Sequence, residues 1–224
     1  ERDIRGEIDI KDELAFIRFL TACAARTGQL LNYANVAEEV GVSQVTIKNW
    51  ISVLSRTGLI YILQPYYSSH LTRAIKTPKL YFRDTGLACY LSKWTSYEAL
   101  ENSAVAGNMF ETFVVSEIIK SFTNEGTEYD FSLFYYRGKD KAKGKVDGEI
   151  VEKEKEIDLI IEENGTLYPI EIKKSANPTA SMASAFDVLD KVVDKNRGTG
   201  VILCMYDQKL YLRENVVVLP IEYI

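Results

Sequence analysis

Near the N-terminus, apolar residues recur at intervals of three and four, the spacing that places side chains on one face of an α-helix. The stretch 12–26 follows this period and predicts a first helix. Its apolar positions are Leu14, Ile17, Phe19, Leu20 and Ala24. Further on, Gly41 and Val42 interrupt a second helical pattern, and Ser43 is placed to cap the helix that follows. The pattern therefore predicts two short helices joined by a tight turn.

The helix after Ser43 has an apolar side and a polar side. Ile47, Ile51 and Leu54 recur at spacings of four and three and should face the core. The opposite side carries Gln44, Lys48 and Asn49. Amide and basic side chains on the outer face of the second helix are typical of a helix-turn-helix unit. Such units bind DNA in some proteins and dock other proteins elsewhere, and both functions stay open.

Two apolar runs, 58–67 and 77–82, predict a pair of antiparallel strands after these helices. The segment 68–76 between them would form a basic tip. We therefore expect a winged helix-turn-helix domain over residues 29–91, preceded by a helical segment over residues 1–28.

This region is locally basic. No acidic residue occurs from 40 to 83, although the whole chain has a net charge of −5. Screening confines each charge to roughly 10 Å, so a local basic patch can meet phosphates on an acidic protein. We expect Lys48, Arg73 and Lys76 to contact phosphates, and Gln44 and Asn49 to suit base edges. A chance scarcity of acidic residues is the alternative.

The second half of the chain alternates helical and strand patterns. A more polar segment, 92–104, is the predicted linker, and a second domain should cover residues 105–224. Its expected elements are a helix at 107–122, a strand at 129–137, a hairpin at 156–174, a helix near 180–195, and strands at 200–206 and 216–221. This order predicts a mixed α/β sheet flanked by helices. The segment 138–156, dense in Lys, Glu and Gly, is interpreted as an exposed, mobile loop or hairpin without chemistry.

The hairpin "EIDLIIEENGTLYPIEIKK" carries charge inside apolar strands. With Asn164-Gly165 as a two-residue turn, Asp158 lies directly across from Glu171. Side chains alternate between faces, so Lys173 shares the face of both carboxylates. The other face is predicted to be a core surface made of Ile157, Leu159, Ile161, Tyr168, Ile170 and Ile172.

Like charges directly opposed on a sheet repel each other. A divalent cation such as Mg²⁺, which prefers hard oxygen ligands, would convert this repulsion into coordination. A lysine two residues beyond Glu171 could stabilise charge that develops in a reaction. We interpret Asp158, Glu171 and Lys173 as a metal site for phosphate chemistry. Alternatively, the face is structural, with Lys173 paired to Glu156 across the strands.

Composition limits the remaining possibilities. The chain has 224 residues, 46% hydrophobic and 26% charged, as in globular proteins. Its longest apolar runs are too short to cross a bilayer. Its three widely spaced cysteines fit reduced thiols better than disulfides or a zinc site. We expect a cytoplasmic protein without a membrane partner, and the initial Glu1 leads us to expect a piece of a longer polypeptide.

Asp158, twelve further residues and then Glu171-Ile172-Lys173 resemble the motif of the PD-(D/E)XK nuclease superfamily, which has the restriction-endonuclease-like fold. The resemblance implies catalytic roles for Asp158, Glu171 and Lys173. It also implies that Glu111, in the preceding helix, joins Asp158 and Glu171 as a Mg²⁺ ligand. The chain departs from the motif at Ile157, where the superfamily name has proline, and in the segment 138–156, which looks inserted.

A wider set of segments is similar to the C-terminal region of a family of prokaryotic AAA-type P-loop ATPases. These segments are "ERDIR", "RTGQLLNYANVAEEVGVS", "PKLYFRDTGLACYL", "GNMFETFVVSEI" and "EIDLIIEENGTLYPIEIKKSANP". The resemblance implies that ATP binds a separate N-terminal domain, since this chain has no G-x-x-x-x-G-K-[ST] motif.

Three functions follow as alternatives. The chain could be a DNA-binding and nuclease-like module of the ATPase that uses Mg²⁺. It could bind nucleic acid or protein without cutting and regulate the ATPase. It could also be a docking or oligomerisation scaffold. DNA and the N-terminal ATPase domain are the expected partners, and the sequence leaves the oligomeric state open.

Overall fold

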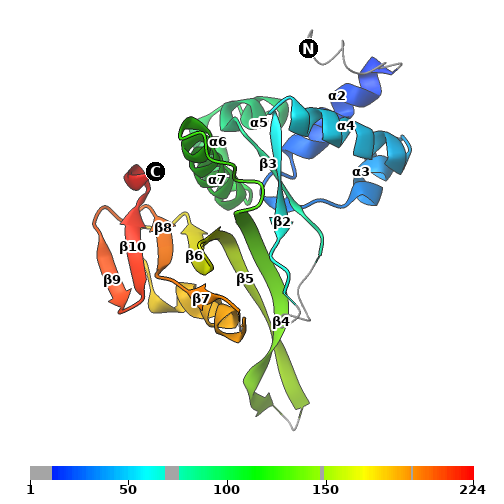
Figure 1. Ribbon diagram of the computed structural model, residues 1–224. Helices are drawn as coiled ribbons and strands as arrows, with labels where there is room; N and C mark the ends of the chain where they lie inside the picture. Colours follow the sequence, from blue (N-terminus) through cyan, green and yellow to red (C-terminus); the bar gives the residue numbers. More distant parts are fainter. Residues whose placement is uncertain (1–11, 69–75, 147–148, 193) are drawn as a thin grey trace. The chain divides into compact units, whose positions relative to one another are not determined.

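The computed structural model has a mixed α/β fold that divides into two compact units (Figure 1). Unit 1 comprises Glu1–Leu63 and Thr77–Ser116, and unit 2 comprises Gln64–Lys76 and Glu117–Ile224. The structure describes residues 12–68, 76–146, 149–192 and 194–224, with the side chains of 140–146 and 149–153 excepted. Each unit is treated separately below.

The described part of unit 1 begins with helix α2 (Glu13–Ala24), and α3 (Tyr33–Val40) and α4 (Gln44–Arg56) follow. Gly41, after α3, has φ 82°, a left-handed conformation that glycine adopts without strain. Ser43 then caps α4, because its Oγ accepts a hydrogen bond from the backbone N–H of Thr46 at 3.1 Å. The predicted turn and cap are therefore confirmed.

The core of unit 1 forms where α2, α3 and α4 pack together. The predicted inward residues of α4, Ile47, Ile51 and Leu54, are all buried. Sequence analysis did not single out Trp50, which is also buried and makes an edge-to-face contact with Phe16 of α2 at 5.2 Å. The aromatic contact helps to fix the angle at which α2 meets α4.

The predicted apolar face of α2 is partly wrong. Leu14 and Ile17 are 58% and 45% exposed. The buried residues of this helix are Ala15, Phe16, Phe19, Ala22, Cys23 and Ala24. Large apolar residues occur on more than one side of α2, so their spacing alone did not identify the side that packs against α4.

The predicted strand pair after α4 is confirmed. Strands β2 (Ile60–Pro65) and β3 (Lys79–Phe82) are antiparallel, and the two-residue strand β1 (Gln29–Leu30) pairs with β3. Helices α5 (Thr85–Leu91), α6 (Tyr97–Glu101) and α7 (Ala106–Asn124) follow.

The segment predicted as a linker, 92–104, contains helix α6. Unit 1 continues past it to Ser116, inside α7. The helix itself runs on to Asn124, in unit 2. The polar composition of 92–104 therefore reflects a short surface helix, whose described residues are mostly exposed.

Unit 2 is built on a mixed sheet with the strand order β4-β5-β6-β8-β10-β9. Its strands are β4 (Leu133–Val146), β5 (Glu149–Glu163), β6 (Thr166–Lys173), β7 (Asn196–Arg197), β8 (Gly200–Cys204), β9 (Leu210–Arg213) and β10 (Val216–Pro220). Strand β5 is antiparallel to both β4 and β6, and β9 is antiparallel to β10, whereas β6, β8 and β10 run parallel to one another. Strand β7 pairs with β6, and the end of β2 at Gln64 pairs in parallel with β4.

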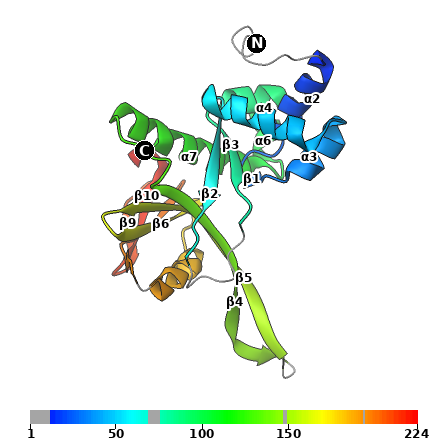
Figure 2. The ribbon, with the colours of Figure 1, turned by 45° about the vertical axis from the view of Figure 1, so that its right-hand side comes forward.

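The described residues of the segment 138–156 lie on two paired strands, as in a hairpin, the second of the two predicted forms. Strands β4 and β5 pair from Leu133 with Ile161 to Val146 with Glu149, and their register shifts between Lys141 and Lys145. Figure 2 shows their paired ends extending beyond the other strands of unit 2.

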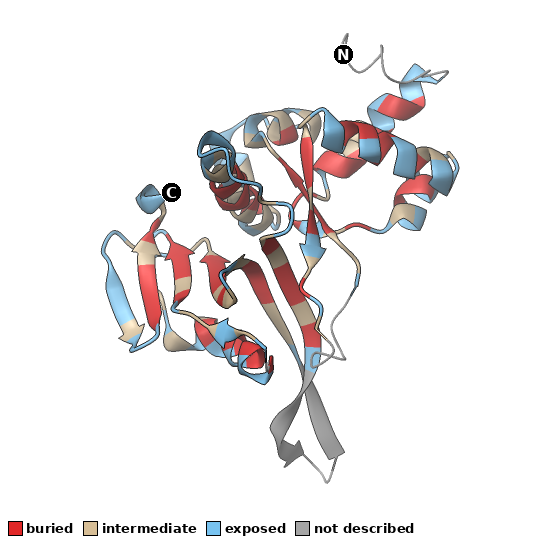
Figure 3. Cartoon of the chain, viewed as in Figure 1, coloured by how far each residue is buried: buried red, intermediate tan, exposed pale blue. Residues whose placement is uncertain are grey.

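A 3₁₀ helix, η1 (Ala180–Lys191), packs on β5, β6 and β8, where the sequence predicted a helix near 180–195. Its residues Phe186 and Leu189 belong to a buried apolar cluster together with Ile160 of β5 and Ile202 of β8. A second 3₁₀ turn, η2 (Ile221–Tyr223), follows β10. Figure 3 shows that the central strands of this sheet are buried along most of their described length.

Candidate active site

The hairpin of β5 and β6 has the predicted register. Asn164 and Gly165 have φ values of 49° and 76°, as a two-residue turn with two left-handed residues requires. Leu159 pairs with Ile170, and the pairing continues to Glu163 with Thr166 next to the turn. Asp158 and Glu171 come directly after the pair of Leu159 with Ile170, on the side away from the turn.

A β-bulge in β5 lies beside Asp158. On the β4 side, Phe134 pairs with Ile160 and Tyr136 pairs with Ile157, so β5 has one residue more than β4 in this interval. An extra residue reverses the alternation of side chains on the bulged strand.

The bulge corrects the predicted composition of the faces. Ile157 belongs to the same buried cluster as Ile160, beneath η1, instead of sharing a face with Leu159. The face of Asp158 and Glu171 is therefore also largely apolar. The carboxylates lie at the margin of a core and not on a separate charged surface.

The side chain of Asp158 takes part in holding the two strands together. Its Oδ2 atom accepts a hydrogen bond of 2.8 Å from the backbone N–H of Ile172 in β6. Asp158 is 5% exposed, and a buried backbone N–H needs such a partner. One carboxylate oxygen thus replaces a backbone carbonyl where the bulge disturbs the ladder.

Lys173 bridges the two carboxylates. Its Nζ lies 2.7 Å from Oε1 of Glu171 and 3.2 Å from Oδ2 of Asp158. The predicted repulsion between Asp158 and Glu171 is therefore balanced by a cation of the chain itself. Asp158 lies on β5, and Glu171 and Lys173 lie on β6, so the paired strands hold the three groups next to one another.

The electrostatic balance around Lys173 favours its charged form. Burial alone would lower the pKa of the Lys173 ammonium, because charge is poorly solvated in the interior. The charges of Asp158 and Glu171, and the hydrogen bonds to both, outweigh burial and raise that pKa well above its ordinary value of 10.5. Lys173 therefore stays protonated at neutral pH.

The surroundings of the three charges are apolar on one side and open on the other. Strand β8 places Ile202 beside Glu171 and Cys204 beside Lys173, and both neighbours are buried. The side chain of Lys173 is 41% exposed, whereas that of Glu171 is 9% exposed. The lysine thus connects solvent with two buried carboxylates, an arrangement in which electrostatic interactions are stronger than in water.

The oxygen atoms of Asp158 and Glu171 are suitable ligands for a hard divalent cation, but two side chains are few ligands for such a site. Two carboxylates on adjacent strands supply oxygen ligands of the kind that Mg²⁺ prefers. Within the described part of the chain, no group of three or more His, Cys, Asp or Glu side chains lies close enough together to hold a metal. Further ligands would have to be water or a substrate oxygen, which is usual for Mg²⁺.

Glu111, the third predicted metal ligand, lies in α7 within unit 1. Its Oε1 accepts hydrogen bonds from Nζ of Lys79 at 2.9 Å and from the hydroxyl of Tyr81 at 2.5 Å. Lys79 and Tyr81 are buried, and both come from β3. Sequence analysis missed this cluster, although a lysine inside the apolar run 77–82 was a usable signal.

The residues predicted to bind nucleic acid are exposed where the structure describes them. Gln44, Lys48 and Asn49 lie on the outer side of α4, in unit 1. Lys48 also lies over the ring of Tyr33, with its Nζ 5.8 Å from the ring centre. Arg73 lies outside the described residues.

Lys76 belongs to unit 2 and is exposed. Its Nζ lies 4.6 Å from the centre of the Tyr67 ring. A cation–π contact leaves the ammonium charge in place, so it is compatible with a phosphate contact.

Among the described helices, none is long and apolar enough to cross a membrane.

Two parts of the chain match family models that are described as domains of unknown function. Residues 1–98 match the family described as DUF8612, and residues 150–224 match DUF4143. The whole chain is 26% identical to the uncharacterized proteins Rv2008c of Mycobacterium tuberculosis and Mb2031c of Mycobacterium bovis. The chain spans 46% of the length of each of these relatives.

Among solved structures, a bacterial protein aligns with most of the chain. The crystal structure of protein VC1899 from Vibrio cholerae covers 93% of this chain and 47% of its own, at 14% identity and a TM-score of 0.34.

Proposed function

We propose that this chain is the DNA-binding and nuclease-like module of a larger AAA-type ATPase, and that unit 2 hydrolyses phosphodiesters with Mg²⁺. The observation that carries the proposal is Lys173 bridging Asp158 and Glu171 on adjacent strands of a mixed sheet. This constellation resembles the PD-(D/E)XK site, and unit 2 would then have the restriction-endonuclease-like fold. The DUF4143 match and the longer mycobacterial relatives are compatible with a module of a larger protein.

In this proposal Asp158 and Glu171 would hold Mg²⁺. Bound there, the cation would supply Lewis-acid stabilisation of a phosphate oxygen and a more acidic water. Asp158 keeps its orientation through the N–H of Ile172, so its second oxygen points in a fixed direction. Lys173, held protonated by both carboxylates, can turn its ammonium toward the negative charge that develops on a phosphate.

Helices α3 and α4 would bring DNA to the protein as a winged helix-turn-helix unit, with β2 and β3 as the wing. The support is the exposed row of Gln44, Lys48 and Asn49 on a capped helix after a tight glycine turn. Amide side chains on such a helix suit base edges, and the lysine suits a phosphate.

A non-catalytic role is the second candidate, and one observation favours it. Lys173 already neutralises much of the charge of Asp158 and Glu171, so their arrangement is stable without an added cation. Unit 2 would then bind nucleic acid or a protein and regulate the ATPase without cutting.

Cleavage of labelled single-stranded and duplex DNA separates the two candidates. Wild-type protein with Mg²⁺ or Mn²⁺ should cut at least one form, and Lys173→Ala and Asp158→Asn should not. Glu163→Ala, an exposed change at the end of β5, is the matched control and should cut normally. Equal cleavage by Lys173→Ala and the wild type would refute the catalytic role.

A further inference from the structure

The exposed residues of α4 form one continuous stripe along the helix, here called the α4 stripe (Figure 3). At about 100° per residue, their positions fall within an arc of roughly 140°, and the buried residues occupy the rest of the circumference. Val45 is 67% exposed although it is aliphatic, and no residue of the stripe is acidic. The members of the stripe are Gln44, Val45, Lys48, Asn49, Ser52, Ser55 and Arg56.

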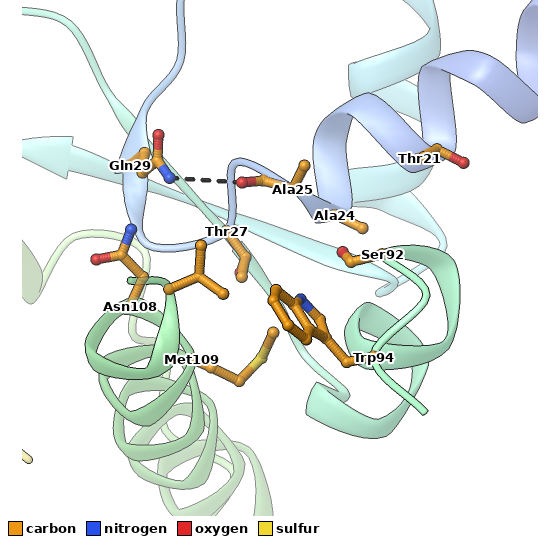
Figure 4. Close-up of a pocket in the computed structure, with 10 residues that line it drawn as sticks. Thr21, Ala24, Ala25, Thr27, Gln29, Ser92, Trp94, Asn108 and Met109 are labelled. Carbon is orange, nitrogen blue, oxygen red and sulfur yellow. Dashed lines mark hydrogen bonds between the residues drawn. The ribbon is translucent and has the colours of Figure 1, made fainter. Parts of the chain in front are cut away.

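A pocket of unit 1 is separate from the α4 stripe (Figure 4). Its lining residues come from the end of α2 and the turn after it, the turn after α5 and the start of α7. No lining residue of this pocket lies in α3 or α4. The stripe is therefore an exposed helix surface, the kind of element that the major groove of duplex DNA admits.

Lys48 is directed toward the first turn of α3. Its Nζ lies 5.8 Å from the centre of the ring of Tyr33, the first residue of that helix. The first turn of α3 contains no acidic residue, and lysines and helix N-termini both contact phosphates in protein–DNA complexes. Lys48 therefore suits the DNA backbone, and Gln44, Val45 and Asn49 are left to face the bases.

The residues at the N-terminal end of α4 have the chemistry that recognises A·T base pairs. Side-chain amides form two hydrogen bonds with adenine, and apolar side chains contact the methyl group of thymine. Guanine is read most often by arginine, but Arg56 lies in the last turn, about 16 Å beyond Val45 along the helix axis. The N-terminal residues of a recognition helix are the ones that reach base edges.

The spacing of Val45 and Asn49 fits neighbouring base pairs. The two residues are four positions apart, so they lie on the same side of α4 with an axial separation of about 6 Å. Base pairs are stacked roughly 3.4 Å apart, so both side chains can act within three consecutive base pairs.

We propose, resting on the DNA-binding role of α4 proposed above, that the α4 stripe reads A·T base pairs in the major groove of duplex DNA. The amide of Asn49 donates to N7 of adenine and accepts from its N6 amino group. Gln44 makes the same pair of bonds to a neighbouring adenine, and Val45 packs against a thymine methyl group. Lys48 contacts a phosphate beside them.

Four duplexes of about 20 base pairs test this specificity with the full chain at low salt, by fluorescence anisotropy. They are a mixed A·T duplex, a G·C duplex, the A·T duplex with deoxyuridine for thymidine, and the A·T duplex with 7-deazaadenine for adenine. The A·T duplex should bind about tenfold more tightly than the G·C duplex, the effect of one bidentate contact. Deoxyuridine should weaken binding about fourfold, the effect of one buried methyl group. 7-Deazaadenine should weaken it about fivefold, the effect of one hydrogen bond.

Variants of the stripe assign each effect to a side chain. Val45→Ala should bind the thymidine and deoxyuridine duplexes equally. Gln44→Ala combined with Asn49→Ala should bind the adenine and 7-deazaadenine duplexes equally. Leu14→Ala, a change of an exposed apolar residue on α2, is the control and should keep both preferences.

The outcomes distinguish this inference from the function on which it rests. Equal wild-type affinity for the A·T and G·C duplexes, or a thymidine preference that persists in Val45→Ala, would overturn the reading of A·T pairs and leave DNA binding intact. If no duplex binds at low salt, the DNA-binding function itself is refuted, and A·T recognition with it.

Discussion

The Oδ2 atom of Asp158 accepts a hydrogen bond of 2.8 Å from the backbone N–H of Ile172 on the neighbouring strand. The contact lies beside the bulge of β5, where an extra residue interrupts the regular ladder. The carboxylate of Asp158 therefore joins β5 to β6 through the N–H of Ile172, and it also contacts the ammonium of Lys173.

The first prediction concerns the stability that this contact provides. Asp158→Ala should lower the free energy of unfolding by about 2 kcal/mol, because it leaves the buried N–H of Ile172 without its charged acceptor. Asp158→Asn should cost about 1 kcal/mol, since an amide oxygen can still accept. Urea unfolding measures both. Glu163→Ala should stay within about 0.5 kcal/mol of the wild type, and equal losses for Ala and Asn at position 158 would contradict the bonding described.

Much of this region could be predicted from the sequence because its determinants are local. Asn164-Gly165 specifies a two-residue turn, and the turn fixes the register of β5 on β6. In the same way, Ser43 was predicted as a helix cap, and its Oγ accepts a hydrogen bond from the backbone N–H of Thr46.

The bulge and the lysine bridge could not be predicted, because they depend on tertiary context. The extra residue near Asp158 exists only relative to the pairing of β5 with β4, and the sequence does not specify the register of that pairing. Lys173 was placed on the correct face, but side-chain torsions decide whether its ammonium faces solvent or the carboxylates. The apolar spacing in α2 likewise did not identify its buried side, since Leu14 and Ile17 share that spacing and are exposed.

The second prediction is the pH dependence of the Lys173 contribution. Its folded-state pKa is raised, so the stability that it provides is fully present below the ordinary value of 10.5 and is lost as the pH rises from there through the raised pKa. Lys173→Met should lower the free energy of unfolding by about 2 kcal/mol at pH 8, a value reduced for partial exposure. The difference in the free energy of unfolding between the wild type and Lys173→Met should become smaller above pH 10.5.

Lys209→Met, a change of an exposed lysine in unit 2, controls for general effects of alkaline pH. It should follow the wild type throughout the range. A gap between wild type and Lys173→Met that widens with rising pH would show that the ammonium is not held by Asp158 and Glu171.

The third prediction tests DNA binding by α4. Lys48→Glu should weaken duplex binding at low salt and reduce the slope of log affinity against log salt by about 1, the effect of one phosphate contact. Lys209→Glu makes the same change in net charge from unit 2 and should have little effect. Extending the change to Arg73 and Lys76 should abolish binding. Unaltered DNA retention by the triple variant would assign the helix pair to protein docking.

The fourth prediction concerns nucleotide. The sequence has no G-x-x-x-x-G-K-[ST] motif, so we expect the chain neither to hydrolyse ATP nor to change its melting temperature when ATP is added. Phosphate release and thermal unfolding, with and without Mg²⁺, measure this. Clear stabilisation by ATP would contradict the assignment of nucleotide binding to a separate domain.

The most direct test is a Mn²⁺ titration followed by electron paramagnetic resonance, because free Mn²⁺ has a signal that binding diminishes. The wild type should bind Mn²⁺ in the submillimolar to millimolar range. Asp158→Asn and Glu171→Gln should bind at least tenfold more weakly, since each removes a hard anionic ligand. Glu163→Gln should bind as the wild type does. If Asp158→Asn, Glu171→Gln and the wild type bind Mn²⁺ equally, or if none binds, the carboxylates bridged by Lys173 are not a metal site.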